Sequence, residues 1–297
     1  MKTVVVMLIT VLMMLSLVAC GKKSEEEPVV ADDGNETVET GYKLVSDGIL
    51  TVSMSTDFAP MEFVDLTKTG QEKYVGSDVE LAKFIADYLG LELLIKPMDF
   101  DTCQASVANG IVDCSISGYS YTAQRAASYL LSEDYFSEGD SGQVALIAKE
   151  NVEVYKDLAS LNQAGVEVAA QNGALQQEIV EEQLPNATLK AIDDLNAAYD
   201  NLSAGTYAAV VVANSVAETL VASYPDKYAI VPEAFDDSKY TGYHVLIALG
   251  NDELKDAINE AIAAVPEDQY KTWQDEGQAL FLSLGENAAE DIIAEEE

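Results

Sequence analysis

The stretch Gly110-Ile-Val-Asp-Cys-Ser-Ile-Ser-Gly-Tyr-Ser-Tyr-Thr-Ala-Gln-Arg125 decides the fold class. Apolar and small side chains alternate from Ile111 to Ser117, which predicts a short buried strand. Thr122 stands three residues before Arg125, as the N-cap of a helix does. A strand that passes through a polar turn into a helix is the repeating unit of open α/β folds. The turn directs unpaired backbone N–H groups outward, and ligands bind there.

Arg125 is the only arginine of the chain. Its planar guanidinium can hold a carboxylate through two parallel hydrogen bonds, which the ammonium of a lysine cannot do. We therefore predict that Arg125 binds a carboxylate ligand. A structural ion pair with one of the many acidic residues is the alternative, and composition alone does not decide between the two.

The first residues have the organisation of an export signal. Lys2 precedes an apolar run from Val4 to Leu15, and Leu17-Val-Ala-Cys20 follows. This segment resembles a bacterial lipoprotein signal peptide over residues 1–19, which implies cleavage before Cys20 and a lipid on its thiol. The protein is then expected on the extracytoplasmic face of the cell membrane, anchored and not spanning. An ordinary signal peptide or a membrane helix is the alternative, although the run is short for a bilayer.

Charge and composition separate the two ends of the chain from its body and limit its partners. Residues 20–46 are acidic and poor in apolar side chains, so they are expected to form a flexible tether, and residues 286–297 an acidic tail. The body between them has about 240 residues, enough for one large domain or two lobes. The net charge of -36 excludes nucleic acid as a partner, because phosphate binding needs clustered Lys and Arg.

Metal, cofactor and catalytic chemistry have little support in the sequence. Cys103 and Cys114 remain once Cys20 is lipidated, and neither has the spacing of a metal site. A disulfide between them is possible outside the cytoplasm, but buried free thiols are favoured. His244, the only histidine, is expected to be a packed or exposed residue and not a catalyst. We expect no cofactor, no metal and no catalytic residue.

Periodicity predicts two α/β units. The first unit has strands near 48–54, 91–96 and 111–117, with a helix from Ser77 to Leu89 and a short one ending near Asn109. Ser77-Asp-Val-Glu80 has the spacing of a capping box. The alternation predicts a parallel sheet with helices on its faces.

The second unit repeats this order. Its expected strands and helices alternate as follows: strand 166–170, helix 174–184, strand 188–192, helix 194–202, strand 207–212, a helix capped by Ser215, and strand 228–231. The run from Tyr207 to Val212 is continuously apolar, which is typical of a strand buried on both faces. A last strand at 243–249 and a helix capped by Asn251 are left over.

Several motifs stand in the order that they have in the extracellular solute-binding proteins of polar amino-acid uptake systems. Gly76-Ser-Asp-Val-Glu-Leu-Ala82 resembles the family's Gly-Phe-Asp-x-Glu-Leu-Ala. Gly110-x-x-Asp113 with Ser120-x-Thr122-x-x-Arg125 resembles its Gly-x-x-Asp and Thr-x-Thr-x-x-Arg. Leu131–Tyr135 and Gln171-Asn-Gly173 resemble two further elements. The resemblance covers roughly residues 47–284.

The resemblance implies a type II periplasmic binding protein of the α/β class. Each lobe is expected to be a mostly parallel sheet flanked by helices, with the ligand cleft between the lobes. Residues 47–138 and 241–285 are assigned to lobe one, and residues 139–240 to lobe two, which accounts for the leftover strand and helix. Hinge closure would bury the ligand.

The resemblance also implies roles for single residues. The residue matching Arg125 grips the ligand carboxylate, and the one matching Ser120 adds a hydroxyl and a backbone N–H. Oxygens near Ser117 and Gly118 would accept from an ammonium group. The aromatic rings that enclose the ligand side chain match Phe58 and Phe100. Tyr119 or its neighbour Tyr121 is expected to face the cleft.

Two departures from the family concern the ligand. Ala213 stands where the family usually has an aspartate that pairs with the ligand ammonium, and Ala174 where it has threonine. Either Asp57, Glu62 or Asn214 compensates, or the ligand is a carboxylate without a free α-amine. The backbone amides of Asn172, Gly173 and Ala174 could still hold an anion at a helix start.

We therefore expect a lipid-anchored, monomeric substrate-binding protein of an ABC transporter. It would capture a small amino acid or related carboxylate and deliver it to a membrane permease. One alternative is an enzyme on the same fold, similar to a dehydratase, with Glu62, Asp99 or Glu133 as its general acid or base. Another is a sensor module that presents the ligand to a receptor.

Overall fold

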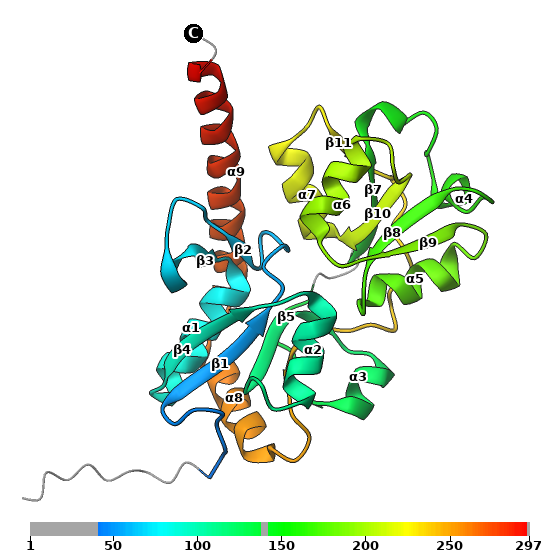
Figure 1. Cartoon of the computed structure of the whole chain (residues 1–297). Helices are drawn as coiled ribbons and strands as arrows, with labels where there is room; N and C mark the ends of the chain where they lie inside the picture. Colours follow the sequence, from blue (N-terminus) through cyan, green and yellow to red (C-terminus); the bar gives the residue numbers. More distant parts are fainter. Residues whose placement is uncertain (1–40, 138–141, 296–297) are drawn as a thin grey trace, which may run out of the picture. The chain divides into compact units, whose positions relative to one another are not determined.

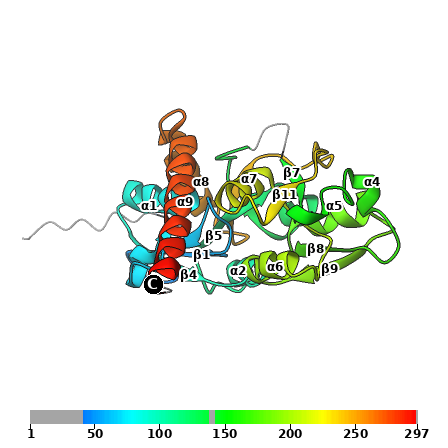
Figure 2. The ribbon, with the colours of Figure 1, turned by 90° about the horizontal axis from the view of Figure 1, so that it is seen from above.

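The computed structural model describes residues 41–137 and 142–295, with side chains through residue 285 (Figures 1 and 2). Residues from Gly41 onward form one compact unit. The predicted signal peptide, the lipidation site Cys20 and most of the tether lie outside the described residues. Within these ranges, no helix combines the length and the apolar character that a bilayer crossing requires.

The first five-stranded sheet is built from both ends of the described chain (Figure 1). In spatial order its strands are β4 (Glu92–Pro97), β1 (Ile49–Met54), β5 (Cys114–Ser120), β12 (Tyr243–Ile247) and β6 (Leu130–Leu131). β12 pairs antiparallel with both of its neighbours, whereas β4, β1 and β5 are parallel. The leftover strand of the sequence analysis therefore joins the first sheet.

The second sheet takes its strands from the middle of the chain. In spatial order they are β11 (Tyr228–Ile230), β7 (Gln143–Ala148), β10 (Ala209–Ala213), β8 (Glu167–Gln171) and β9 (Thr188–Ile192). Here β7 is antiparallel to both neighbours, and β10, β8 and β9 are parallel. In each described sheet, the strand that runs against the others is the first one after the chain crosses from the other sheet. This strand is β7 in the second sheet and β12 in the first. The expectation of mostly parallel sheets is confirmed.

Helices flank both sheets. Those next to the first sheet are α1 (Ser77–Leu89), α2 (Phe100–Ala108), α3 (Ala123–Ser128), α8 (Asp252–Ala264) and α9 (Gln269–Glu295). Those next to the second sheet are α4 (Leu158–Leu161), α5 (Leu175–Gln183), α6 (Leu195–Ser203) and α7 (Asn214–Ser223). A small hairpin of β2 (Phe63–Val64) and β3 (Tyr74–Val75) and two short 3-10 helices, Gly70–Lys73 and Lys149–Asn151, complete the described elements.

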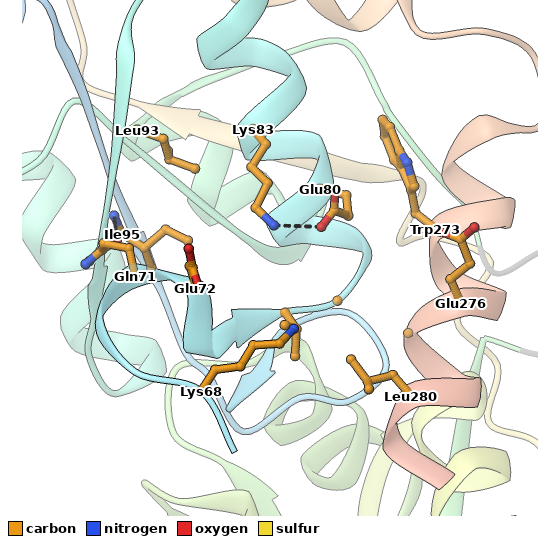
Figure 3. A pocket seen from close by; sticks show the side chains of 13 residues that line it. Lys68, Gln71, Glu72, Glu80, Lys83, Leu93, Ile95, Trp273, Glu276 and Leu280 are labelled. Atoms are coloured by element: carbon orange, nitrogen blue, oxygen red, sulfur yellow. Dashed lines mark hydrogen bonds and ion pairs between the residues drawn. The ribbon is translucent and has the colours of Figure 1, made fainter. Parts of the chain in front are cut away.

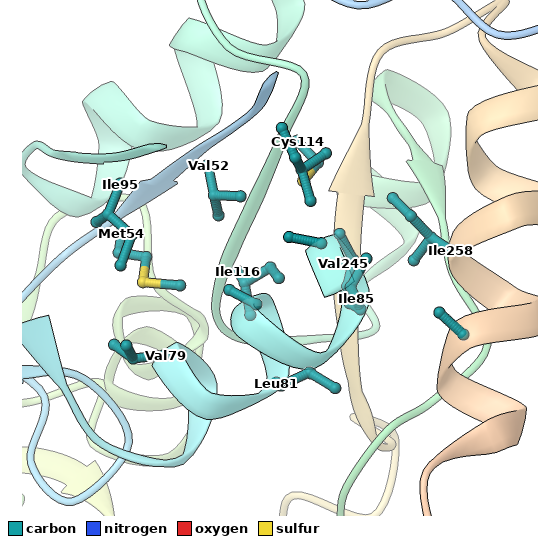
Figure 4. Packing of buried hydrophobic residues seen from close by; sticks show 14 of the residues in the cluster. Val52, Met54, Val79, Leu81, Ile85, Ile95, Cys114, Ile116, Val245 and Ile258 are labelled. Carbon is teal, nitrogen blue, oxygen red and sulfur yellow. The ribbon is translucent and has the colours of Figure 1, made fainter. Parts of the chain in front are cut away.

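Each sheet has an apolar core that its sequence predicts. Val52 and Ile116 of the first sheet pack against Ile85 of α1 and Ile258 of α8, all without exposed surface (Figure 4). Burying side chains of this size stabilises the fold by about 1.5–3 kcal/mol each. In β10 the alternate valines face two separate clusters, as the continuous apolar run indicates. The second sheet is thus covered on both faces.

The expected capping box at the start of α1 is wrong. Gly76 is the N-cap, with φ 118°, and a Cβ there would lie 2.2 Å from the carbonyl oxygen of Met61. The N–H groups of Ser77 and Asp78 donate instead to the carbonyls of Pro60 and Met61, at 3.2 and 2.9 Å. The hydroxyl of Ser77, which would have been the cap, donates instead to the hydroxyl of Tyr270 at 3.1 Å. Similarly, the N-cap of α7 is Ala213 and not the predicted Ser215.

Both ends of the predicted body extend further than expected. Tyr42 and Leu44, assigned to the tether, pack against the core of the first sheet, and Val45 donates its N–H to Asp113 at 2.6 Å. At the other end α9 runs to Glu295, through most of the predicted tail. The lobe boundaries stay a prediction. The strands of the first sheet fall within residues 47–138 and 241–285, and those of the second sheet within residues 139–240.

Helix α9 touches the layers of both sheets. Trp273 packs against Phe84 of α1 with ring centroids 6.1 Å apart. Further along, Gln278 Nε2 donates to Thr219 Oγ1 of α7 at 3.2 Å, and Phe281 packs against the core of the second sheet. Figures 1 and 2 show α9, in red, beside α1 and α7.

Candidate functional site

Arg125 lies in the first turn of α3, directly after β5. The hydroxyl of Thr122 accepts the backbone N–H of Arg125 at 3.1 Å, so the predicted N-cap is confirmed. The cap fixes the start of the helix and with it the direction of the arginine side chain. The residue is 5% exposed.

Among the described residues, the guanidinium of Arg125 has only neutral hydrogen-bond partners. It donates to the Ser120 carbonyl at 2.8 Å, to Gln104 Oε1 at 3.3 Å and to the Gly173 carbonyl at 3.3 Å. The rings of Phe100 and Tyr119 lie 5.6 and 5.2 Å from its central carbon. Among the ion pairs of the described residues, none involves Arg125. The alternative of a structural ion pair is therefore not what the structure contains.

Burial lowers the pKa of Arg125 to about 10. The group nevertheless remains charged at neutral pH, because that value lies well above 7. A desolvated cation without an anionic partner is unfavourable. An incoming carboxylate would relieve this cost.

A cavity of about 20 Å³ opens beside Arg125. It is lined by residues from the layers of both sheets: Phe58, Phe100, Ser117, Gly118, Ser120, Arg125, Gln143, Gln171, Ala174, Leu175, Gln176 and Tyr243. This volume holds about one water molecule. An amino acid is larger, so its entry requires the walls to separate.

Seven of the residues predicted from the sequence meet at this cavity. They are Arg125, Ser117, Gly118, Ser120, Phe58, Phe100 and Ala174. Gly118 has φ 57°, and a Cβ there would lie 3.1 Å from the Phe58 ring, so glycine allows this ring to approach. Phe100 packs on Tyr119 with ring centroids 4.9 Å apart.

The other predicted residues do not line the cavity. Tyr119 has no exposed surface, and its hydroxyl is 2.9 Å from that of Ser115. Asn214 donates its side-chain amide to Glu218 at 3.0 Å. The backbone N–H groups of residues 172–174 donate to Ile192, Gln177 and Gln171, so an anion could bind there only if these bonds broke.

Asp57 connects the layers of the two sheets. Its carboxylate accepts hydrogen bonds from the Leu195 N–H at 2.8 Å, the Ser55 hydroxyl at 2.8 Å and Gln171 Nε2 at 3.3 Å. Burial raises the pKa of Asp57. Asn172 Nδ2 makes a similar connection to Asp101, at 3.0 Å.

Sequence reasoning missed the glutamines of the site. Gln143, Gln171 and Gln176 line the cavity and are all buried, and Gln104 holds Arg125. A signal was available, since Gln143 begins an otherwise apolar strand and Gln176 lies on the inner face of α5. Long neutral polar side chains are rarely buried without a partner.

A buried pair of carboxyl groups lies behind the cavity. Burial, and then the charge of Asp78, raises the pKa of Glu62 well above its usual 4.5, which favours the protonated form of Glu62. Its Oε1 accepts the Ser117 hydroxyl. Its Oε2 has no N–H or O–H donor within reach, and a hydrogen bond with Asp78 contributes to the raised pKa of Glu62.

Asp78 is the member of that pair with more hydrogen-bond donors. It accepts from the Gly118 N–H at 2.8 Å and from the hydroxyls of Tyr135 and Tyr270, at 3.0 and 2.5 Å. Burial raises the pKa of Asp78, whereas the Tyr270 hydrogen bond opposes the rise. Four donors, with Glu62 included, stabilise one buried negative charge.

Several cavities are larger, including one of 520 Å³ that Asp57 and Asp99 help to line. One of 380 Å³ lies on the outer side of Arg125, next to Glu178. Another of 540 Å³ lies between α1, β4 and α9, where Figure 3 shows Lys83 paired with Glu80 at 2.7 Å beside Trp273. None of the predicted site residues lines the cavity of 540 Å³. The described residues contain no group of His, Cys, Asp and Glu arranged to hold a metal ion.

The sequence model of the bacterial extracellular solute-binding proteins, family 3, matches residues 50–276. The chain belongs to this family. Its fold is that of the two-lobed periplasmic binding proteins in the family, with mixed α/β sheets flanked by helices.

Relatives of this solute-binding protein bind amino acids. The L-cystine-binding protein TcyJ of Escherichia coli K12 is 28% identical over 226 residues, which cover 76% of this chain and 80% of TcyJ. The arginine-binding extracellular protein ArtP of Bacillus subtilis 168 is 27% identical over 268 residues, 88% of this chain and 92% of ArtP.

A solved structure is similar as well. The substrate-binding protein of an amino-acid ABC transporter from Streptococcus pneumoniae, solved with L-arginine bound, has a TM-score of 0.72. The two sequences are 31% identical, and the match covers 78% of this chain and 94% of the pneumococcal chain.

Proposed function

We propose that this protein is the substrate-binding component of an ABC transporter. It captures a small amino acid or related carboxylate in the cavity beside Arg125 and delivers it to a membrane permease. A lipid on Cys20 holds the monomer at the extracytoplasmic face of the membrane.

The observation that carries the proposal is the unpaired charge of Arg125. A guanidinium has five N–H donors, and neutral protein oxygens accept one each from Nε, Nη1 and Nη2. One N–H therefore remains on each terminal nitrogen. The two oxygens of a carboxylate can each accept one of these N–H groups.

Ligand entry would work through separation and closure of the two sheet layers. The contacts of Asp57 with Leu195 and of Asn172 with Asp101 cross between the layers. A ligand that bridges the same layers adds contacts to the closed arrangement, so binding shifts the population toward it.

The test is a ligand screen by thermal unfolding of the mature protein against amino acids and small carboxylates. At a ligand concentration of 100 Kd the stability gain is about 2.7 kcal/mol. For a protein of this size, this raises Tm by roughly 5–10 °C. Arg125→Lys should remove most of that rise, while Gln124→Lys on the same short helix should retain it.

Two results would contradict the proposal. One is a ligand-dependent rise in Tm that Arg125→Lys leaves intact. The other is a large drop in Tm of Arg125→Lys without ligand, which would assign a structural role to the arginine. The lipid anchor has its own test, because Cys20→Ser should move the protein from the membrane fraction to the medium.

An enzyme on this fold has less support. None of the carboxyl groups considered as a general acid or base, Glu62, Asp99 and Glu133, lines the cavity beside Arg125. A sensor module would use the same binding residues. Transport of the bound ligand by reconstituted permease, with and without this protein, separates a transport role from a sensing role.

A further inference from the structure

Among the described residues, the cavity beside Arg125 has a single charged lining group. Its remaining lining consists of aromatic, aliphatic, hydroxyl and amide side chains and a glycine. The charge that this site offers to a ligand is therefore that of one guanidinium. A bound monoanion would make the buried site neutral.

An ammonium group would find no anionic partner among the described residues that line this cavity. Asp57 already accepts from three donors and does not line the cavity. Glu62 is fully buried and occupied by Ser117 and Asp78. Asn214 is bonded to Glu218. None of the three residues that could compensate for Ala213 is thus available without rearrangement.

A pair of glutamines stands at the place where a charged partner would be useful. Gln143 lies opposite Ala213 in the register of β7 and β10. Gln176 Nε2 donates to Gln143 Oε1 at 2.7 Å, and the two side chains belong to residues that are 3% and 8% exposed. The amide nitrogen of Gln143 and the oxygen of Gln176 have no protein partner among the described residues. If both amides were turned over, one donor and one acceptor would still remain.

We propose, on the basis of the function proposed above, that the ligand is a monocarboxylate whose neighbouring substituent is uncharged. A hydroxyl, a carbonyl or an acylated amine at that position meets the open donor and acceptor of the Gln143–Gln176 pair. Arg125 holds the carboxylate. The class comprises 2-hydroxy acids, 2-oxo acids and N-acyl amino acids.

Desolvation provides the selectivity. A neutral hydroxyl or amide exchanges its water hydrogen bonds for those of the two glutamines. An ammonium loses a hydration shell that neutral amide groups replace only in part. The amino acid should therefore bind less tightly than its uncharged analogue, although both carry the carboxylate that Arg125 recognises.

The experiment measures Kd by calorimetry for matched sets of ligands. L-alanine, L-leucine, L-glutamine and L-phenylalanine are each compared with the corresponding 2-hydroxy acid, 2-oxo acid and N-acetyl derivative. In the set that binds most tightly, at least one uncharged analogue should bind tenfold or more tightly than its amino acid.

Gln143→Glu reverses the expected order. It adds a carboxylate at the pair with little change of shape, so the amino acid should gain at least tenfold in affinity relative to its analogue. Gln176→Glu places the charge on the other member of the pair and serves if Gln143→Glu unfolds early. Gln163→Glu, at an exposed position outside the cavity, is the control and should leave the order unchanged.

The outcomes separate this inference from the proposed function. If an amino acid binds as tightly as its analogues and Arg125→Lys abolishes its binding, the ligand class is wrong and the proposed function stands. If no carboxylate binds, or if binding is independent of Arg125, both are wrong. An order that Gln143→Glu and Gln176→Glu leave unchanged would show that the pair does not read the substituent.

Discussion

The hydroxyl of Ser117 donates to Oε1 of Glu62, a carboxyl group with no exposed surface. Ser117 also accepts the backbone N–H of Ser55, at 3.1 Å, and lines the cavity. A hydroxyl has one proton and two lone pairs, so one lone pair remains as an acceptor. Glu62 thereby determines which kind of group Ser117 offers to a ligand.

Glu62→Gln should be nearly neutral at pH 7, within about 1 kcal/mol of unfolding free energy, because an amide can donate to Asp78 and accept from Ser117 as the protonated acid does. Glu62→Ala should cost about 2–4 kcal/mol, because it leaves Asp78 and Ser117 without a partner in a cavity. Urea unfolding of both variants measures this. Equal losses would contradict a protonated Glu62.

The same group gives a pH dependence with a defined sign. The folded state holds the proton of Glu62 above its usual pKa of 4.5, whereas the unfolded chain releases it there. The free energy of unfolding of the natural protein should therefore fall relative to Glu62→Gln as the pH rises above 4.5, by at most about 1.4 kcal/mol per pH unit. The fall ends at the pKa of the folded state. A rise in the unfolding free energy of the natural protein relative to Glu62→Gln as the pH increases above 4.5 would overturn the assignment.

Asp113 should matter for stability and not for binding. Its carboxylate accepts from the N–H groups of Val45 and Thr51, at 2.6 and 2.7 Å, and from the Thr51 hydroxyl at 2.5 Å. Asp113→Ala leaves these donors unpaired and should lower the unfolding free energy by about 2–4 kcal/mol. The ligand Kd, measured below Tm, should stay within about twofold. A loss of affinity would show that Asp113 also shapes the cavity.

Asp57→Ala should weaken ligand binding by about tenfold, because it removes a hydrogen bond of about 1–2 kcal/mol that holds the two sheet layers together. Asp194→Ala is the matched control, since Asp194 caps α6 locally through the N–H of Ala197. The control should lower Tm without changing Kd. If both variants bind equally well, the contact between Asp57 and Leu195 does not contribute to closure.

Cys103 and Cys114 should not react in the folded protein. Both are buried free thiols, as the sequence analysis favours. Burial raises the pKa of Cys103 to about 12 and also raises that of Cys114, so little thiolate forms at pH 8. Labelling with a maleimide should be complete within minutes in guanidinium and at least about a hundredfold slower without it. Rapid labelling of the folded protein would contradict the burial.

Local sequence signals predicted most of the elements. Apolar periodicity located the strands and helices of both sheets, and the Thr122 cap formed as expected, because its partner is only three residues away. The capping box at Ser77 failed for the opposite reason. The Ser77 hydroxyl, which that box would use as its cap, donates to the Tyr270 hydroxyl, 193 residues away in the sequence.

The site was predicted in part for a similar physical reason. Arg125, Ser117 and Ser120 belong to one continuous stretch, so a single motif identifies them together. The lining glutamines come from separate segments of the chain. Gln143 in β7 and Gln176 in α5 come into contact only when the second sheet and its flanking helix pack together. Asp57 carries a carboxylate that could pair with an ammonium group. In the structure this carboxylate accepts the N–H of Leu195, a contact that sequence spacing does not reveal.

Because α9 rests on α1 through Trp273 and is tied to α7 through Gln278 and Thr219, any widening of the cavity must stretch, break or carry along that second attachment. Helix α9 is therefore coupled to the opening of the cavity beside Arg125, although none of its described side chains lines that cavity. An environment-sensitive fluorophore placed on α9 opposite Thr219 would turn this coupling into an optical signal for uptake and release.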